Sequence, residues 1–265
     1  MLETTWFVLW GLLWAVYFVL DGFDFGMGTL LPFLAKNDEE KRIIYNAAGP
    51  YWDGNEVWLI TAGGVTFAAF PKAYAVMFSA LYAPLLILLF ALIFRAVSFE
   101  FRNKKDCPQW RKFWDACQFL GNFLPALLLG VAFANLFMGI PIDGNGVYHG
   151  NIIKLLNPYG LAGGIFFVLI FAMHGALWLA LKSEGDIHER AVGAAQVVWP
   201  LVLAVALLFL ALTAFYTNLY ANYAEHPTLL VFPILAVASL LTVRVMIWAD
   251  NLLGAWFFSA LFIIT

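Results

Sequence analysis

Charged residues are scarce in this chain: Asp, Glu, Lys and Arg make up 12% of its 265 residues, against about a quarter of a typical soluble domain. With so few charges and so many apolar residues, the chain is neither a disordered protein nor a nucleic-acid-binding protein. Cysteine is also scarce, and Cys107 and Cys117 alone cannot form a disulfide framework. We expect no cleavable signal peptide, because Met1–Thr5 has no basic residue and the apolar run after it is too long.

Apolar and aromatic residues dominate the sequence instead. Hydrophobic residues make up 63% of it, the mean hydropathy is +0.85, and there are 26 Phe, 11 Trp and 10 Tyr residues. One water-soluble core cannot bury so many, so we predict an all-α, polytopic bundle of transmembrane helices. Seven segments have the ~20 mostly apolar residues that a span requires: 6–31, 51–70, 73–94, 114–138, 158–181, 192–217 and 229–248.

An eighth apolar run begins at Leu252 and is still apolar at Thr265, which is too short for a full span. We therefore expect about eight spans in a single membrane domain, residues 1–265, with the chain truncated inside its eighth helix. If the N-terminus lies outside, 12 of the 14 Lys and Arg residues fall on the cytoplasmic side, and only Lys72 and Lys154 fall on the other. The positive-inside rule then places the 95–113 loop in the cytoplasm.

Four acidic residues interrupt the first two predicted spans. Asp21 and Asp24 lie three residues apart, and Asp53 and Glu56 repeat this spacing, so each pair shares a helix face. A carboxylate inside a membrane costs at least ~2.5–3.5 kcal/mol, so such groups are protonated, paired or linked to water. The acids either form a proton path from the cytoplasm or play a structural part, in which Asp21 or Asp53 pairs with Arg95.

Other polar residues give weaker signals. Glu100 is interpreted as a supporting charge near the interface, together with Arg95. His174 is the only histidine inside a predicted span, whereas a low-spin haem needs two axial ligands. The two cysteines match no zinc or iron–sulfur spacing. We therefore expect no metal site and no catalytic centre in this chain alone.

Two motifs resemble one protein family. The stretches Leu20–Gly28 (LDGFDFGMG) and Pro50–Gly64 (PYWDGNEVWLITAGG) are similar to subunit II of the cytochrome bd quinol oxidases. The resemblance continues, in order, through Phe94–Arg102, Gly130–Asn135 and Leu156–Gly160.

This resemblance implies a complex in a bacterial or archaeal cytoplasmic membrane that oxidises quinol and reduces dioxygen to water with cytoplasmic protons. Subunit I of the family ligates haems b and d, and this chain would ligate none. The family also implies a small single-helix subunit and a bound quinone. Its further helices beyond the eighth agree with a C-terminal truncation.

The resemblance also assigns roles to individual residues. Asp24 and Asp53 match acidic positions of the family's proton path, with Asp21 beside them. Glu56 adds an acid where some relatives have Gln. Arg95 matches a basic position near the acids, and Trp58 matches a position near an oxygen route.

Two other functions compete with an oxidase subunit. Buried acids also suit a proton-coupled transporter, although no inverted repeat is visible and the resemblance disfavours this. A purely structural membrane scaffold stays open, because the sequence does not show whether Asp24 conducts protons or packs. For a partner subunit we expect contacts at Gly22, Gly26, Trp52 and Trp58.

Overall fold

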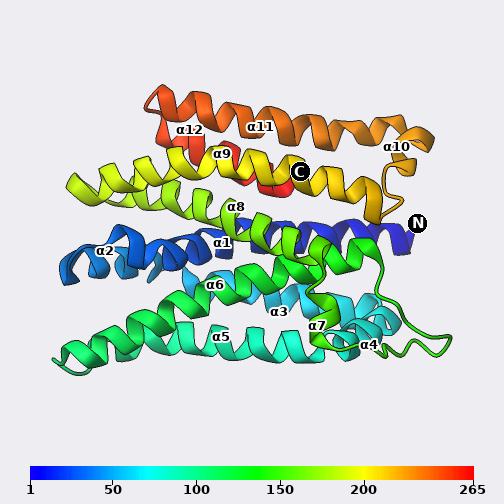
Figure 1. Ribbon diagram of the computed structural model, residues 1–265, viewed down its shortest axis with the longest axis horizontal. Helices are drawn as coiled ribbons and strands as arrows, with labels where there is room; N and C mark the ends of the chain where they lie inside the picture. The colour runs from blue at the N-terminus through cyan, green and yellow to red at the C-terminus, as the bar shows by residue number, and fades with distance from the viewer.

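The computed structural model describes residues 1–265 as helices joined by short connections, with a single isolated β-bridge between Ile142 and Tyr148. Eight helices run side by side along the long axis (Figure 1): α1 (Leu2–Leu34), α3 (Trp52–Ala69), α5 (Tyr82–Phe101), α6 (Pro108–Met138), α8 (Pro158–Lys182), α9 (Gly185–Tyr216), α11 (Val231–Trp248) and α12 (Leu252–Ile264). The others are short: α2 (Asp38–Ala48), α4 (Pro71–Ala80), α7 (Ile152–Leu155), α10 (Ala221–Glu225) and the 3₁₀ helix η1 (Pro227–Leu230).

The bundle has two distinct ends. One end carries α2 and the turns after α5, α8 and α11, and we call it the α2 end (Figure 1, left). The opposite end carries the N-terminus, α4, α10 and the 139–157 connection (Figure 1, right). The acids of α1 and α3 lie toward the α2 end, because α1 ends there and α3 begins there.

The helical membrane architecture is confirmed. Six helical segments are long and apolar enough to span a membrane: α1, α5, α6, α8, α9 and Pro227–Trp248. Helix α3 is absent from this group, since its first two turns carry the polar residues Asp53, Asn55 and Glu56. Helix α12 is a shorter apolar helix of 13 residues.

The predicted span 73–94 is wrong in its bounds. Helix α4 ends at Ala80, and α5 starts after Leu81 and continues to Phe101. Pro84 explains the break, because it has no N–H to donate to the Ala80 carbonyl and its ring would clash with that carbonyl. The shift matters for the site, since it places Arg95 inside a helix rather than at a helix end.

Helix α2 was not predicted, although a signal for it is present. The Asn37 side chain accepts a hydrogen bond from the Glu40 backbone N–H at 2.9 Å, which caps the helix. The Glu40 carboxylate accepts one from the Lys36 N–H at 2.6 Å. This reciprocal pattern is close to a capping box and can be read from the spacing of Asn37 and Glu40.

Helices α1 and α8 pack closely at the centre of the bundle. A Cβ added at Gly26 would lie 1.8 Å from the Phe171 carbonyl oxygen, and one at Gly175 would lie 2.5 Å from the Met27 nitrogen. Only glycine permits this approach. The expectation that Gly22 and Gly26 contact a partner subunit is therefore wrong, because a Cβ at Gly22 would also meet Phe171.

Candidate functional site

The core of the candidate site is an ion-pair cluster built around Arg95 of α5. The Arg95 side chain is completely buried and forks onto Asp21 of α1, with Nη1 2.7 Å from Oδ1 and Nη2 3.1 Å from Oδ2. Nη2 also contacts the Glu56 carboxylate of α3. The guanidinium lies over the Phe25 ring, 4.8 Å from its centroid. One cation thus ties together three helices that are distant in sequence.

Asp24 belongs to the same cluster but has no cation of its own. It is 2% exposed, and its Oδ2 accepts a hydrogen bond from Asn55 Nδ2 at 2.8 Å. The same Asn55 nitrogen donates to the Leu20 carbonyl at 3.0 Å. Asp24 Oδ1 is buried and has no hydrogen-bond partner. Asn55 was not singled out from the sequence, although it stands between Asp53 and Glu56.

The cluster combines strong pairing with a surplus of acid. The bidentate contact of Arg95 with Asp21 is the geometry in which a guanidinium group binds a carboxylate best. Removing one partner of such a buried pair costs roughly 3–5 kcal/mol, because the other charge is left without compensation. Asp24 and Glu56 add two further carboxyl groups around this single cation, so the cluster can hold protons as well as charge.

The other predicted site residues lie outside the cluster. Asp53 is exposed in the first turn of α3, where its carboxylate accepts the Gly54 N–H at 2.8 Å. Glu100 is exposed on α5 and forms no ion pair. Trp58 is half-buried on α3 and packs against the main hydrophobic core. The equal spacing of the two acid pairs therefore does not bring all four acids together.

His174 of α8 is buried and fully engaged within the chain. Its Nδ1 lies 2.6 Å from Ser259 Oγ, and its Nε2 lies 3.1 Å from the Val19 carbonyl. The imidazole stacks on Trp256 with ring centroids 5.2 Å apart. No group of three or more His, Cys, Asp or Glu side chains is placed to hold a metal ion. His174 thus has no free nitrogen to offer an iron.

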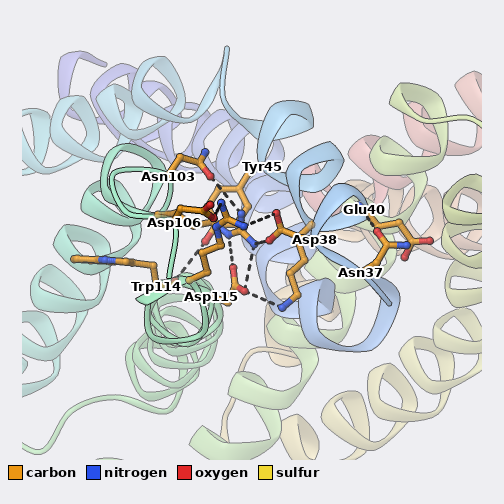
Figure 2. A network of polar contacts seen from close by, with 11 residues as sticks. Asn37, Asp38, Glu40, Tyr45, Asn103, Asp106, Trp114 and Asp115 are labelled. Atoms are coloured by element: carbon orange, nitrogen blue, oxygen red, sulfur yellow. Dashed lines mark hydrogen bonds and ion pairs between the residues drawn. The ribbon is translucent and has the colours of Figure 1, made fainter. Parts of the chain in front are cut away.

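A second network lies at the α2 end and was not predicted. Arg102 is 1% exposed, with Nε 2.6 Å from Asp115 Oδ1 and Nη2 2.6 Å from Asp38 Oδ1. Figure 2 shows Asp38 and Asp115 on different sides of this network, and Lys41 reaches Asp115 at 2.8 Å. Partial burial raises the pKa of Asp38, but hydrogen bonds from Arg102 and its charge outweigh this and lower the pKa.

The two networks share one face of α5. Arg95, Ser98 and Arg102 follow the i, i+3, i+7 spacing, which places them on one side of a helix. Ser98 lies between the networks, contacts Gln118 of α6 and donates to the Arg95 carbonyl at 2.6 Å. This spacing is the signal that could have revealed the Arg102 network.

The chain matches known proteins over its whole length. The sequence model of the family "Cytochrome bd terminal oxidase subunit II" matches residues 2–265. Subunit 2 of the cytochrome bd ubiquinol oxidase of Bacillus subtilis is 42% identical over 84% of this chain and 66% of the relative. Subunit 2 of the bd-I ubiquinol oxidase of Escherichia coli K12 is 44% identical over 74% of this chain and 53% of the relative.

A more distant relative and a solved structure cover more of the chain. A probable cytochrome oxidase subunit 2 of Haemophilus influenzae is 37% identical over 98% of this chain and 77% of the relative. A chain of the bd oxidase structure from Geobacillus thermodenitrificans superposes with a TM-score of 0.79 at 18% identity, covering 98% of this chain and 82% of that one. The chain thus spans about half to two thirds of the Escherichia coli and Bacillus relatives, and the solved structure has the same fold.

Proposed function

Because this chain belongs to the family of cytochrome bd terminal oxidase subunit II, we propose that it is a haem-free subunit of a complex that oxidises quinol and reduces dioxygen to water. The match over residues 2–265 carries this proposal. The chain is accordingly a multi-pass protein of the bacterial cytoplasmic membrane. Haems b and d belong to the partner, subunit I, in this proposal, and the two engaged nitrogens of His174 support it.

The partner surface is proposed on α3. A Cβ added at Gly64 would meet nothing within 4 Å, and Gly64 lies opposite the buried residues Asn55, Ala62 and Thr66, so the outer face of α3 is open to a close-packing helix. The low hydropathy of α3 makes it a poor lipid-facing helix. Trp58 is half-buried beside this face, while Trp52 stacks on Phe99 with centroids 5.1 Å apart.

Co-purification tests the proposed function. We expect the affinity-tagged chain, extracted from bacterial membranes, to bring with it a larger subunit whose spectrum contains haems b and d. A small single-helix subunit and a bound quinone are further expected components. Quantitative recovery of the tagged chain as a haem-free monomer, from cells that contain the other subunits, would contradict the proposal.

We propose eight spans, with the N-terminus outside and the α2 end in the cytoplasm, which follows from the distribution of Lys and Arg. Cys107 tests this orientation, because it is partly exposed in the 102–107 turn while Cys117 is buried. A membrane-impermeant maleimide should label Cys107 in inside-out vesicles and leave it unlabelled in intact spheroplasts. Labelling in spheroplasts alone would reverse the topology, and Cys107→Ser is the background control.

The acids on α1 and α3 are proposed to carry cytoplasmic protons toward the dioxygen site of the partner. Asp53 lies at the surface of the α2 end, Glu56 is partly exposed, and Asp24 and Asp21 are buried. Arg95 and Glu100 are proposed as supporting charges and Trp58 as part of an oxygen route. A purely structural scaffold is the second candidate, and the ion pairs of Arg95 with Asp21 and Glu56 favour it for these two acids.

A further inference from the structure

Asp24 lies among more acidic side chains than the one nearby cation, Arg95, can neutralise. The charged and titratable groups around it are Asp21 of α1, Glu56 of α3 and Arg95 of α5. Tyr17 lies one turn before Asp21, and His174 is the titratable group that α8 brings toward α1. Arg95 is committed to Asp21 and Glu56, so ionisation of all three acids would leave a net charge of −2 in a buried place. Such a surplus is relieved by binding a proton.

Asp24 is the acid on which that proton fits best. Asp21 accepts two hydrogen bonds from the guanidinium, and the Glu56 side chain is 24% exposed and touches the guanidinium as well. Asp24 has neither a cation nor solvent: a single neutral amide bonds one oxygen, and the other oxygen has no partner. An ionised carboxyl group in that setting would leave its charge almost uncompensated.

The orientation of Asn55 decides which oxygen carries the proton. The Leu20 carbonyl can only accept a hydrogen bond, so the Asn55 atom beside it must be the NH₂ group. The same NH₂ group faces Asp24 Oδ2 and donates to it. Oδ2 is thereby the accepting carbonyl oxygen of the acid, and the proton belongs on Oδ1.

We propose that Asp24 is a protonated carboxylic acid in the resting protein, and that Asn55 is the positioning residue that keeps its proton on Oδ1. This inference deepens the proposed proton path and rests on it. Oδ1 is buried and has no acceptor within this chain, so transfer begins when a water molecule, or a group of the partner subunit, moves to within hydrogen-bond distance of it. When the O–H bond breaks, the proton passes to that acceptor. The carboxylate that remains takes up the next proton from the cytoplasmic side.

Infrared difference spectroscopy of the whole oxidase complex tests the inference. The wild-type complex should show the C=O stretching band of a buried carboxylic acid, and Asp24→Asn should remove it. Asn55→Ala should move this band to higher frequency, because the C=O group loses its hydrogen bond. It should also slow oxygen reduction by about fivefold, which corresponds to one hydrogen bond, and shift its pH profile. Asn55→Ser keeps a small donor and should restore part of both effects.

Asn135→Ala is the matched control. Asn135 is 2% exposed and donates to two backbone carbonyls, those of Val131 and Leu155, far from the acids. Its replacement should leave the carboxylic band and the pH profile unmoved.

The outcomes separate this inference from the proposed function. If no carboxylic band disappears in Asp24→Asn, Asp24 is ionised and the inference is overturned. If the band disappears there but is unmoved in both Asn55 variants, the positioning role is overturned. If the band behaves as expected while Asp24→Asn takes up protons at the wild-type rate, the protonated Asp24 is supported and the proton path is contradicted.

Discussion

Arg95→Leu is expected to abolish stable assembly of the oxidase complex. The substitution leaves Asp21 without its two guanidinium hydrogen bonds and Glu56 without its partner, all inside the bundle. Loss of one partner of a buried ion pair costs roughly 3–5 kcal/mol, which is a large part of the ~5–15 kcal/mol that stabilises a typical domain. The yield of the complex after detergent extraction, its haem content and its thermal stability measure the effect.

Two comparisons make this prediction specific. Arg244→Leu removes another cation of the bundle, one that lies over Trp199 and Trp248 and pairs with no carboxylate, and it should assemble at nearly the wild-type level. Adding Asp21→Leu to Arg95→Leu removes both buried charges and should recover part of the lost stability. Full stability of Arg95→Leu alone would show that the cluster does not hold α1, α3 and α5 together.

Asp24→Asn is expected to leave the complex assembled but to slow its quinol-dependent oxygen consumption. The amide has the size of the carboxylic acid, and its oxygen can still accept the hydrogen bond from Asn55, so the packing of α1 on α3 survives. It cannot bind and release a proton, and proton-transferring groups are typically worth ~10²–10⁴ in rate. We therefore expect quinol-dependent oxygen consumption to fall by at least about tenfold with the haem spectrum retained.

Asp186→Asn is the control for that substitution. Asp186 is exposed in the first turn of α9 and undergoes the same chemical change away from the cluster. Its oxygen consumption should equal that of the wild type. A loss of haem in Asp24→Asn would instead assign Asp24 to structure, which is the role that a pure scaffold requires.

The helices were predictable because each long apolar run is a local property of the sequence. The bounds of the third span were wrong because hydropathy does not register Pro84, which prevents one continuous helix: α4 ends at Ala80 and α5 begins at Tyr82. Gly22 and Gly26 were predicted to contact a partner subunit, but the sequence does not say which helix approaches them, and the neighbour is α8 of the same chain.

Much of the candidate site was also predictable, since a buried acid needs a partner and Arg95 was the nearest available cation. Asp21 was one of two candidates for it, and the structure selects Asp21. The spacing of Asp53 and Glu56 did not show that only Glu56 reaches Arg95 while Asp53 faces outward. That outcome depends on how α3 is rotated against α1 and α5, which involves contacts between distant segments.

Proton uptake during a single turnover tests the central claim most directly. The fully reduced complex is mixed with oxygen in a weakly buffered solution that contains a pH dye, and haem oxidation and dye absorbance are followed together. In the wild type, proton uptake should accompany formation of water. In Asp24→Asn, binding of oxygen to the haem should keep its rate while proton uptake lags by about tenfold or more. Uptake at the wild-type rate in Asp24→Asn would contradict a proton path through this chain.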